Sequence, residues 1–227
     1  MGAEQSTGSM AAAVNDVFDR KTNKYISGFS RPFVFVTALN YTVPQMNIYK
    51  PLSWALRDWT IGTVLQYASG MPIKAPIAQN QLSSLLFRST FAERVEGESL
   101  FTKNLNSDYD PSYDFVLNKD AWVDPPAGHF SYGAAYYSDY RYQRRPSEAV
   151  SLGRIFRLKE GVNLSIRADF QNIFNRPFPA NPTSTNAKAT QTVSPTTGKT
   201  ISGFGYINTG SVAVPPRSGL IVARISF

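Results

Sequence analysis

Apolar and polar residues alternate with a period of two in five stretches of the chain. The clearest stretch is GVNLSIRADFQNIF, whose apolar positions are Val162, Leu164, Ile166, Ala168 and Phe170. The other four stretches are RPFVFVTALNYTV, RDWTIGTVLQYAS, EAVSLGRIFRL and the C-terminal SGLIVARISF. Because successive side chains of a strand point to opposite faces, this period predicts five strands, each with one apolar face and one mixed face.

The links between these predicted strands are alternately short and long. Residues 159–161 (KEG) and 44–56 form the short links, and residues 70–146 and 175–215 form the long ones. Within the last link, the Ser/Thr/Asn-rich tract 181–202 is expected to be a flexible loop. Loops longer than about 12–15 residues are uncommon in compact soluble domains. The pattern predicts an all-β fold, an antiparallel transmembrane β-barrel with long external loops.

Alternation alone fits a soluble β-sandwich equally well, so the sandwich stays an alternative at this point. Two details favour the barrel. Trp59 and Tyr67 share a face and lie about 26 Å apart along a strand, or about 19 Å across a membrane at a tilt of about 45°, which suits two aromatic girdles. Arg167, Asp169 and Gln171 alternate with an unbroken apolar set. These three residues are predicted to face a wet lumen while the apolar set faces lipid.

Composition narrows the chemistry that the chain can perform. The chain has no cysteine and a single histidine, so thiolate catalysis, cysteine metal sites and a histidine relay are not expected. Nucleophile-elbow, Walker and dinucleotide motifs are also absent from the sequence, and we expect neither an enzyme nor a bound cofactor. The net charge of +7 is spread along the chain without a block of like charges, which argues against a nucleic-acid partner. The sequence shows no apolar run of transmembrane-helix length and no signal-peptide pattern at its start.

Five segments follow one another in an order typical of one protein family. They are SRPFVFVTALNYTVP (30–44), RDWTIGTVLQYASGMPI (57–73), FVLNKDAWVDPPAGHF (115–130), SLGRIFRLKEGVNLSIRADFQNIFNRPFPANP (151–182) and PPRSGLIVARISF (215–227). Together they resemble the C-terminal barrel region of TonB-dependent outer-membrane receptors, and the likeness is greatest to the Oar-like group with a carboxypeptidase-regulatory-like domain. The most specific motif is RADFQNIFNRPF, in the penultimate predicted strand. The resemblance covers most of residues 30–227, whereas residues 1–29 and the loop tips match poorly.

The resemblance implies a place and an orientation. It places the chain in the outer membrane of a Gram-negative cell with the C-terminus on the periplasmic side. Residues 1–29, 70–146 and 175–215 are then external, and both short links are periplasmic. Phe227 is similar to the terminal aromatic residue that the barrel assembly machinery recognises, so Phe227 is predicted to be an assembly signal.

Receptors of this family also have a signal peptide, a plug domain and about 22 strands. The resemblance therefore makes the predicted strands, about five to six in number, a segment of a larger barrel. Since this sequence shows neither plug nor signal peptide, it resembles the C-terminal portion of a receptor and is not expected to transport anything alone. The intact receptor would take up a metal chelate, an oligosaccharide or a peptide with energy from the TonB system. The implied partners are outer-membrane lipid, the remainder of the receptor (plug and N-terminal strands), the barrel assembly machinery, and TonB acting through the missing N-terminal part. The alternative function is a secreted or surface β-sandwich module that binds carbohydrate.

The stretch YGAAYYSDYRYQRRP is the candidate ligand loop. Its flat tyrosine rings could stack on a sugar or chelate, and its cations, which include Arg144 and Arg145, would attract an anionic ligand. The competing interpretation is that these tyrosines extend a strand above the membrane. The candidate ligand residues are Tyr136, Tyr137, Tyr140, Arg141 and Tyr142.

Three further features are expected to be structural. Asp108, Asp110 and Asp114 lie close together but lack the glycine and distal glutamate of an EF-hand loop, so a solvated acidic turn is expected there. His129 has no second histidine with which to form a metal site. Arg154 interrupts an apolar face and is expected to extend its guanidinium to the lipid headgroups.

Overall fold

In the computed structural model, the described residues are 16, 18–19, 21–44, 51, 53, 56–80, 82 and 90–227. The chain divides into two compact units, each built from separate segments of the sequence. Unit 1 consists of Met1–Pro32, Ser69–Arg144 and Pro179–Val212, and unit 2 consists of Phe33–Ala68, Arg145–Phe178 and Ala213–Phe227. Much of the predicted N-terminal segment 1–29, and part of the link 44–56, lie outside the described residues.

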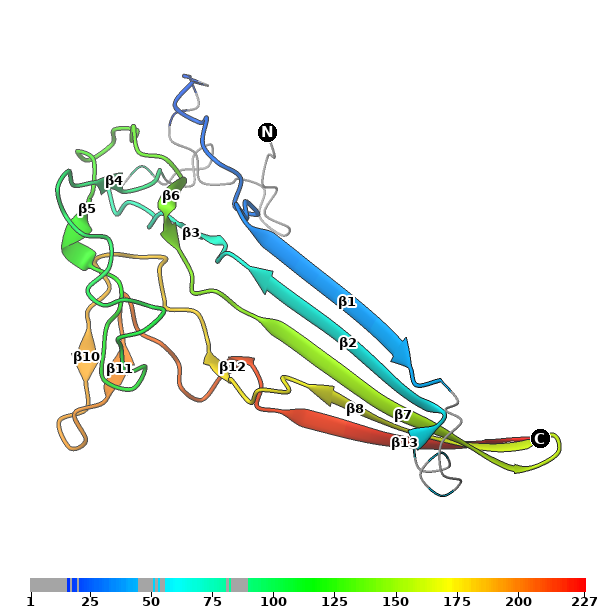
Figure 1. Ribbon diagram of the computed structural model, residues 1–227. Helices are drawn as coiled ribbons and strands as arrows, with labels where there is room; N and C mark the ends of the chain where they lie inside the picture. Colours follow the sequence, from blue (N-terminus) through cyan, green and yellow to red (C-terminus); the bar gives the residue numbers. More distant parts are fainter. Residues whose placement is uncertain are drawn as a thin grey trace. The chain divides into compact units, whose positions relative to one another are not determined.

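The described part of unit 2 contains one antiparallel sheet of long strands (Figure 1). The strands are β1 (Val34–Thr42), β2 (Trp59–Ala68), β7 (Ser147–Lys159), β8 (Val162–Gln171) and β13 (Ser218–Ser226), in the order β1-β2-β7-β8-β13. Their lengths run from 9 to 13 residues, which suits the about 9–11 residues of a tilted strand that crosses a membrane. The five strands predicted from alternation are confirmed.

The pairing register brings the apolar positions of all five strands onto one face of the sheet. One row across this apolar face consists of Tyr41, Ile61, Leu152, Ala168 and Ile221. The adjacent row, on the opposite or mixed face, consists of Asn40, Gly62, Ser151, Asp169 and Leu220. A slip of one residue in any strand would move its apolar side chains to the other face, so the turns and the hydrophobic pattern agree on this register.

No second sheet covers the apolar face in the described part of the chain. Phe35, Leu39 and Tyr41 are at least half exposed, and Ile221 is 72% exposed. Among the described hydrophobic residues of unit 2, Ala68 alone is buried. A soluble sandwich would bury such a face against a second sheet. Within the described part of unit 2 no second sheet packs on this face, so the structure gives the sandwich alternative no support.

A tight turn joins β7 to β8. Lys159 pairs with Val162, so the turn consists of Glu160 and Gly161 and is one residue shorter than the predicted link 159–161. Gly161 has a φ of 77°, in the left-handed region that glycine enters without a Cβ clash. This hairpin fixes the register between the two most strongly alternating strands.

The two long links do not remain open loops but fold together as unit 1. The short strands of this unit are β3 (Pro72–Lys74), β4 (Glu93–Arg94), β5 (Trp122–Val123), β6 (Tyr136–Arg141), β10 (Thr192–Val193) and β11 (Thr200–Ser202), with a 3₁₀ helix at Lys119–Ala121. They pair as β3 with β6, β4 with β5, and β10 with β11. Strands β9 (Phe178–Pro179) and β12 (Val212–Val214) lie where the chain passes from one unit to the other. Among the described residues, no helix is both long and apolar enough to cross a membrane.

Unit 1 has a hydrophobic core of its own, drawn from both long links. Ile73, Phe91 and Val116 come from the first link and Phe204 from the second, and each is at most 1% exposed. The tract 181–202 differs from the flexible loop expected there, because it contains the β10–β11 hairpin, and the buried Thr200 at the end of that hairpin bonds to the carbonyl of Ser112 through its N–H at 2.9 Å. Its hydrogen bonds and buried neighbours make this tract part of the folded unit.

Candidate functional site

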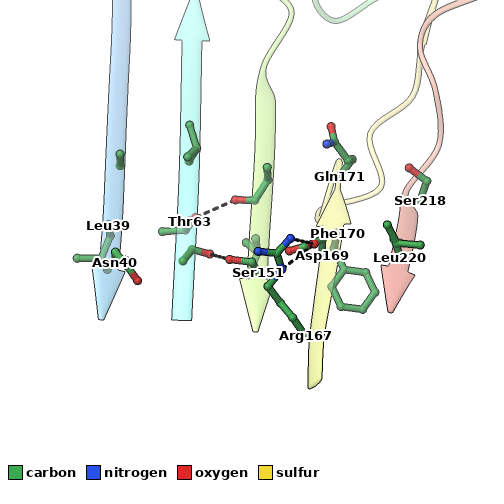
Figure 2. A pocket seen from close by; sticks show the side chains of 16 residues that line it. Leu39, Asn40, Thr63, Ser151, Arg167, Asp169, Phe170, Gln171, Ser218 and Leu220 are labelled. Carbon is green, nitrogen blue, oxygen red and sulfur yellow. Dashed lines mark hydrogen bonds and ion pairs between the residues drawn. The ribbon is translucent and has the colours of Figure 1, made fainter. Parts of the chain in front are cut away.

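A hollow of about 750 Å³ lies on the sheet of unit 2, and all five strands contribute to it (Figure 2). Most of the lining residues belong to the mixed face. The polar ones include Asn40, Ser151, Arg167, Asp169, Gln171 and Ser218. The hollow therefore gathers polar side chains from strands that are far apart in the sequence.

Small residues on the middle strands create this hollow. Gly62 on β2 lies opposite Ser151 on β7, and a Cβ at position 62 would lie 2.5 Å from the Ser151 Oγ. Gly153, on the same face of β7 but outside the lining, is similarly crowded, with a Cβ there 2.7 Å from the Thr60 Oγ1. Since real Cβ atoms do not approach other atoms so closely, larger residues would displace these neighbours. β2 and β7 contribute the small Gly62 and Ser151 to the lining, and β8 contributes the longer Arg167 and Gln171.

The three residues predicted to face a lumen all line this hollow. The Arg167 Nε donates to the Asp169 Oδ2 at 3.0 Å, and a terminal guanidinium nitrogen forms an ion pair with the same oxygen at 2.9 Å (Figure 2). Both side chains are partly exposed, so the pair contributes about 1 kcal/mol or less to stability. Gln171 lies on the same strand face, two residues further along. The structure thus brings the three residues together on the face opposite the apolar one, and a wet lumen beside them stays a prediction.

Arg154 and Glu148 interrupt the apolar face, and each lies beside one of the predicted girdle aromatics. The Arg154 guanidinium carbon is 5.4 Å from the ring centroid of Trp59, its partner in the register, and 4.6 Å from that of Phe156. Tyr67 donates its hydroxyl to the Glu148 Oε1 at 2.9 Å. Cation–π contacts thus accommodate the Arg154 cation on this apolar surface. Its extension to lipid headgroups stays a prediction.

The loop after β8 is fastened to the buried Glu148. Arg176 forms an ion pair with the Glu148 Oε1, and the Ile173 N–H donates to the Glu148 carbonyl oxygen at 3.3 Å. Asn172 and Asn175 take positive φ angles of 49° and 52°, which turn the chain back toward β7. A buried carboxylate needs such a partner, because an unpaired buried charge is strongly destabilising. The motif RADFQNIFNRPF therefore has a structural role at the end of the sheet.

The middle of the tyrosine-rich stretch forms β6, and two of its rings lie in the core of unit 1. Tyr136 is buried, and Tyr140 is fully buried with its ring 5.2 Å from that of Trp122. Burial raises the pKa of Tyr140, whose hydroxyl has no hydrogen-bond partner among the described residues. These two rings pack inside the protein, which differs from the exposed stacking surface expected for a ligand loop.

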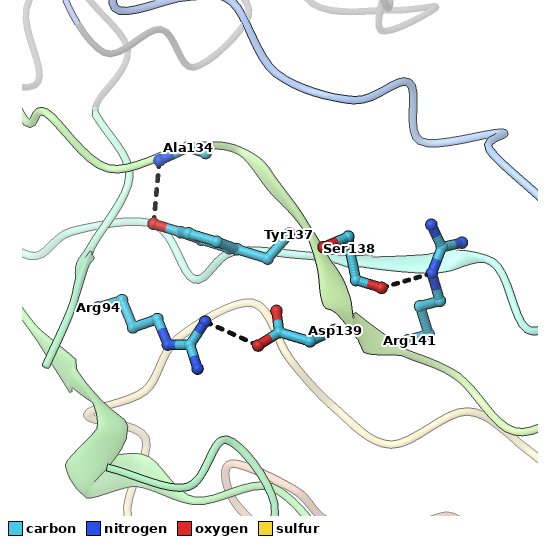
Figure 3. Close-up of polar contacts among 6 residues, drawn as sticks. All are labelled: Arg94, Ala134, Tyr137, Ser138, Asp139 and Arg141. Atoms are coloured by element: carbon cyan, nitrogen blue, oxygen red, sulfur yellow. Dashed lines mark hydrogen bonds and ion pairs between the residues drawn. The ribbon is translucent and has the colours of Figure 1, made fainter. Parts of the chain in front are cut away.

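Tyr137 and Arg141 also support the fold. The Tyr137 hydroxyl accepts a hydrogen bond from the Ala134 N–H at 3.0 Å, and burial raises the pKa of Tyr137 (Figure 3). Arg141 donates to the carbonyl oxygens of Ser30 at 2.6 Å and Gly70 at 3.1 Å. The guanidinium thereby ties together two segments of unit 1 that are distant in sequence.

Tyr142, unlike the other candidate tyrosines, lines a cavity. The cavity, of about 370 Å³, lies within unit 1 and is also lined by Lys103, Arg141 and Arg144. Arg145, the next cation in the sequence, belongs to unit 2. No sequence pattern singles out Lys103, because it lies far upstream of the tyrosine-rich stretch.

The clustered aspartates cap the turns of their own segment. The Asp110 Oδ1 accepts from the Ser112 N–H at 2.8 Å, and the Asp114 Oδ2 accepts from the Asp110 N–H at 2.7 Å. His129 contributes its carbonyl oxygen, which accepts from the Asn80 Nδ2 at 2.6 Å. Within the described ranges, no group of three or more His, Cys, Asp or Glu side chains is placed to hold a metal ion.

Phe227 follows the last strand and is fully exposed. The strand before it is paired to its end, with Ser226 opposite Asn163. A terminal ring held beside a paired strand end is accessible to a partner protein. Its role as an assembly signal stays a prediction.

Comparison with known families gives one match. A family model described as an outer membrane beta barrel domain matches residues 1–218 of the chain, so it spans both units. The match includes residues 1–29, which the receptor resemblance covers poorly, and it stops at the start of β13. No curated protein and no solved structure matches the chain.

Proposed function

Because the chain belongs to the outer membrane beta barrel domain family, we propose that it forms the C-terminal wall of a TonB-dependent outer-membrane transporter. Membership of the family makes the chain an outer-membrane β-barrel protein. The proposal adds the receptor class, the orientation in the membrane and the energy-coupled uptake of a ligand. It assigns no catalytic activity to the chain.

The open sheet with an uncovered apolar face is the observation that carries the proposal. β1 and β13 are its edges, and among the described residues they pair with no further long strand. Bacterial barrels of the outer membrane have at least about eight strands, and an unpaired strand edge is costly in lipid because its backbone groups find no water. Further strands must therefore complete the wall. In a receptor of the proposed class they come from the preceding part of the same protein, which also supplies the plug.

The proposed orientation follows from the order of strands and links. The apolar face meets lipid, and the mixed face with Arg167, Asp169 and Gln171 meets the lumen or the plug. The C-terminus and the turn at Glu160–Gly161 are periplasmic, and the links that build unit 1 are external. Support comes from the fact that both long links, expected on the same side, share one hydrophobic core.

In the intact receptor, a metal chelate, an oligosaccharide or a peptide would first bind on the external side. Energy transmitted through TonB would then displace the plug and open the lumen. The proposed partners of this chain are lipid, the remainder of the receptor, the machinery that recognises Phe227, and the TonB system; no nucleic acid is involved. Transport requires all of these parts, so the wall segment alone is not expected to transport.

Single cysteines test the lipid-facing wall, since the chain has no cysteine of its own. Leu39 and Asn40 are neighbours on opposite faces of β1. In outer membranes that contain the receptor expressed from its complete gene, we expect a water-soluble maleimide to label Asn40→Cys. Leu39→Cys should stay unlabelled until detergent dissolves the membrane. Equal labelling of the two variants in membranes would contradict the proposed wall.

Cross-linking to TonB in living cells tests the receptor class. We expect a receptor–TonB product that disappears when the TonB-binding segment of the receptor is deleted. A correctly inserted barrel that gives no such product would contradict the transporter and leave the wall in place.

A further inference from the structure

The cavity of about 370 Å³ in unit 1 has a lining rich in hydrogen-bond donors. It lies between residues 101–106 and residues 139–144, with Ser69 and Gly70 at its border. Phe101 and Leu105 supply an apolar wall. The volume falls within the about 300–1,000 Å³ of typical ligand sites, and an apolar wall with a few convergent polar groups is their usual construction.

Two asparagine side chains in the lining use their amide oxygens in hydrogen bonds and leave their amide nitrogens without a partner among the described residues. The Asn104 Oδ1 accepts from the Asn106 N–H at 2.9 Å, and the Asn106 Oδ1 accepts from the Arg144 N–H at 3.4 Å. Neither Nδ2 makes a hydrogen bond within the described part of the chain. Because the backbone occupies their acceptor atoms, both amides are left to act as donors.

The charges of the lining leave a positive surplus. The lining contains three cationic side chains, those of Lys103, Arg141 and Arg144. Asp139 is the one carboxylate among the described lining residues. Arg94 pairs with Asp139 at 2.8 Å (Figure 3), so this carboxylate does not neutralise the other cations. Lys103 and Arg144 form no ion pair within the described ranges. The cavity therefore has cations and donors that no acceptor of the described chain uses.

We propose that this cavity binds a small acidic sugar through its carboxylate. The Arg144 guanidinium matches a carboxylate in shape, and the Lys103 ammonium adds a second charge-assisted hydrogen bond. The amide nitrogens of Asn104 and Asn106 donate to the sugar hydroxyls, while the apolar edge of the ring contacts Phe101. This inference rests on the proposed function, because it treats the acidic sugar as the substrate that the receptor admits.

Calorimetric titration of the detergent-purified full-length receptor tests the cavity, with glucuronate as probe and glucose as its neutral match. We expect glucuronate to bind at least about tenfold more tightly than glucose, a difference of about 1.4 kcal/mol. Affinity for glucuronate should fall as salt rises, because both cations are solvent-exposed. Lys103→Gln and Arg144→Gln should each weaken glucuronate binding by about five- to tenfold. Lys199→Gln removes the same charge from the exposed turn of the β10–β11 hairpin and should change nothing.

Equal affinity for glucose and glucuronate would overturn the proposal, as would unchanged binding in both Lys103→Gln and Arg144→Gln. Sulfate that binds as tightly as glucuronate would overturn the assignment of a sugar. A receptor that binds glucuronate but gives no TonB cross-link would support the cavity and contradict the transporter. A receptor that cross-links to TonB but ignores glucuronate would contradict the cavity alone.

Discussion

The two units of this chain place their apolar residues in opposite ways. In unit 1, Phe91 and Phe204 lie inside a closed core, whereas in unit 2, Leu39 and Ile221 lie exposed across one face of a sheet. The hydrophobic effect explains the arrangement in unit 1, because its apolar side chains are buried away from water. The same effect does not explain unit 2, whose apolar side chains are exposed. A large exposed apolar face is stable only against another apolar phase. The contrast is what the proposed wall requires, with water around unit 1 and lipid beside unit 2.

The largest expected effect comes from emptying the core of unit 1. Phe204→Ala should destabilise unit 1 by about 3–5 kcal/mol, because a fully buried aromatic leaves a cavity when it is truncated. Hydrogen exchange of the receptor, read by mass spectrometry, should show faster exchange in peptides from residues 69–144 and 179–212. Peptides from β7 and β8 should keep their protection. Equal loss of protection in the sheet would contradict the separation of the two units.

A charge on the apolar face should have the next largest effect. Ile221→Arg places a guanidinium toward lipid, at a cost of about 2–4 kcal/mol near the middle of the membrane. The neighbouring variant Val222→Arg points to the mixed face and should cost about 1 kcal/mol or less. Urea unfolding of the receptor in lipid vesicles measures both free energies. If the two variants are equally destabilised, the two faces do not differ in solvent.

The smallest expected effect concerns Tyr140. Its raised pKa means that the folded state favours the protonated phenol, so the associated stability is present below the ordinary pKa of about 10 and is lost as the pH rises toward the folded value. Tyr140→Phe should remove this alkaline loss and stabilise unit 1 by about 1 kcal/mol, since the buried hydroxyl has no partner. Thermal unfolding between pH 8 and about 11 measures the effect. Tyr132→Phe, at an exposed position, is the control and should leave the profile unchanged.

Alternation predicts the sheet well because each strand of unit 2 is long and keeps its period. In β8, apolar and polar residues alternate without a break from Val162 to Gln171. Because the link between β7 and β8 is short, β7 is the expected pairing partner of β8. The register of the other strands was not predicted. Gly219, for example, admits the Phe170 ring, which would lie 2.8 Å from a Cβ at that position, and such a fit between strands has no local sequence signal.

The fold of unit 1 could not be predicted from the sequence, because its strands are short and its contacts join residues that are far apart in the sequence. β4 and β5 contain two residues each, too few to show a period. Tyr136 and Tyr140 do share one parity within β6, so alternation indicates a common face, but it does not distinguish a core from a ligand surface. The cavity beside Tyr142 also depends on Lys103 and Asn106, which only the tertiary fold brings to Arg144.

The interleaving of the two units has a consequence for how the chain is made. The core of unit 1 needs Phe204 and Ile207, which leave the ribosome after β1, β2, β7 and β8. Contacts of such long sequence separation form slowly, because loop closure precedes the stabilising contacts. Unit 1 therefore cannot complete its core until Phe204 and Ile207 have been synthesised. An outer-membrane protein is exported before it folds, and an order of segments that completes one core late is compatible with that sequence of events.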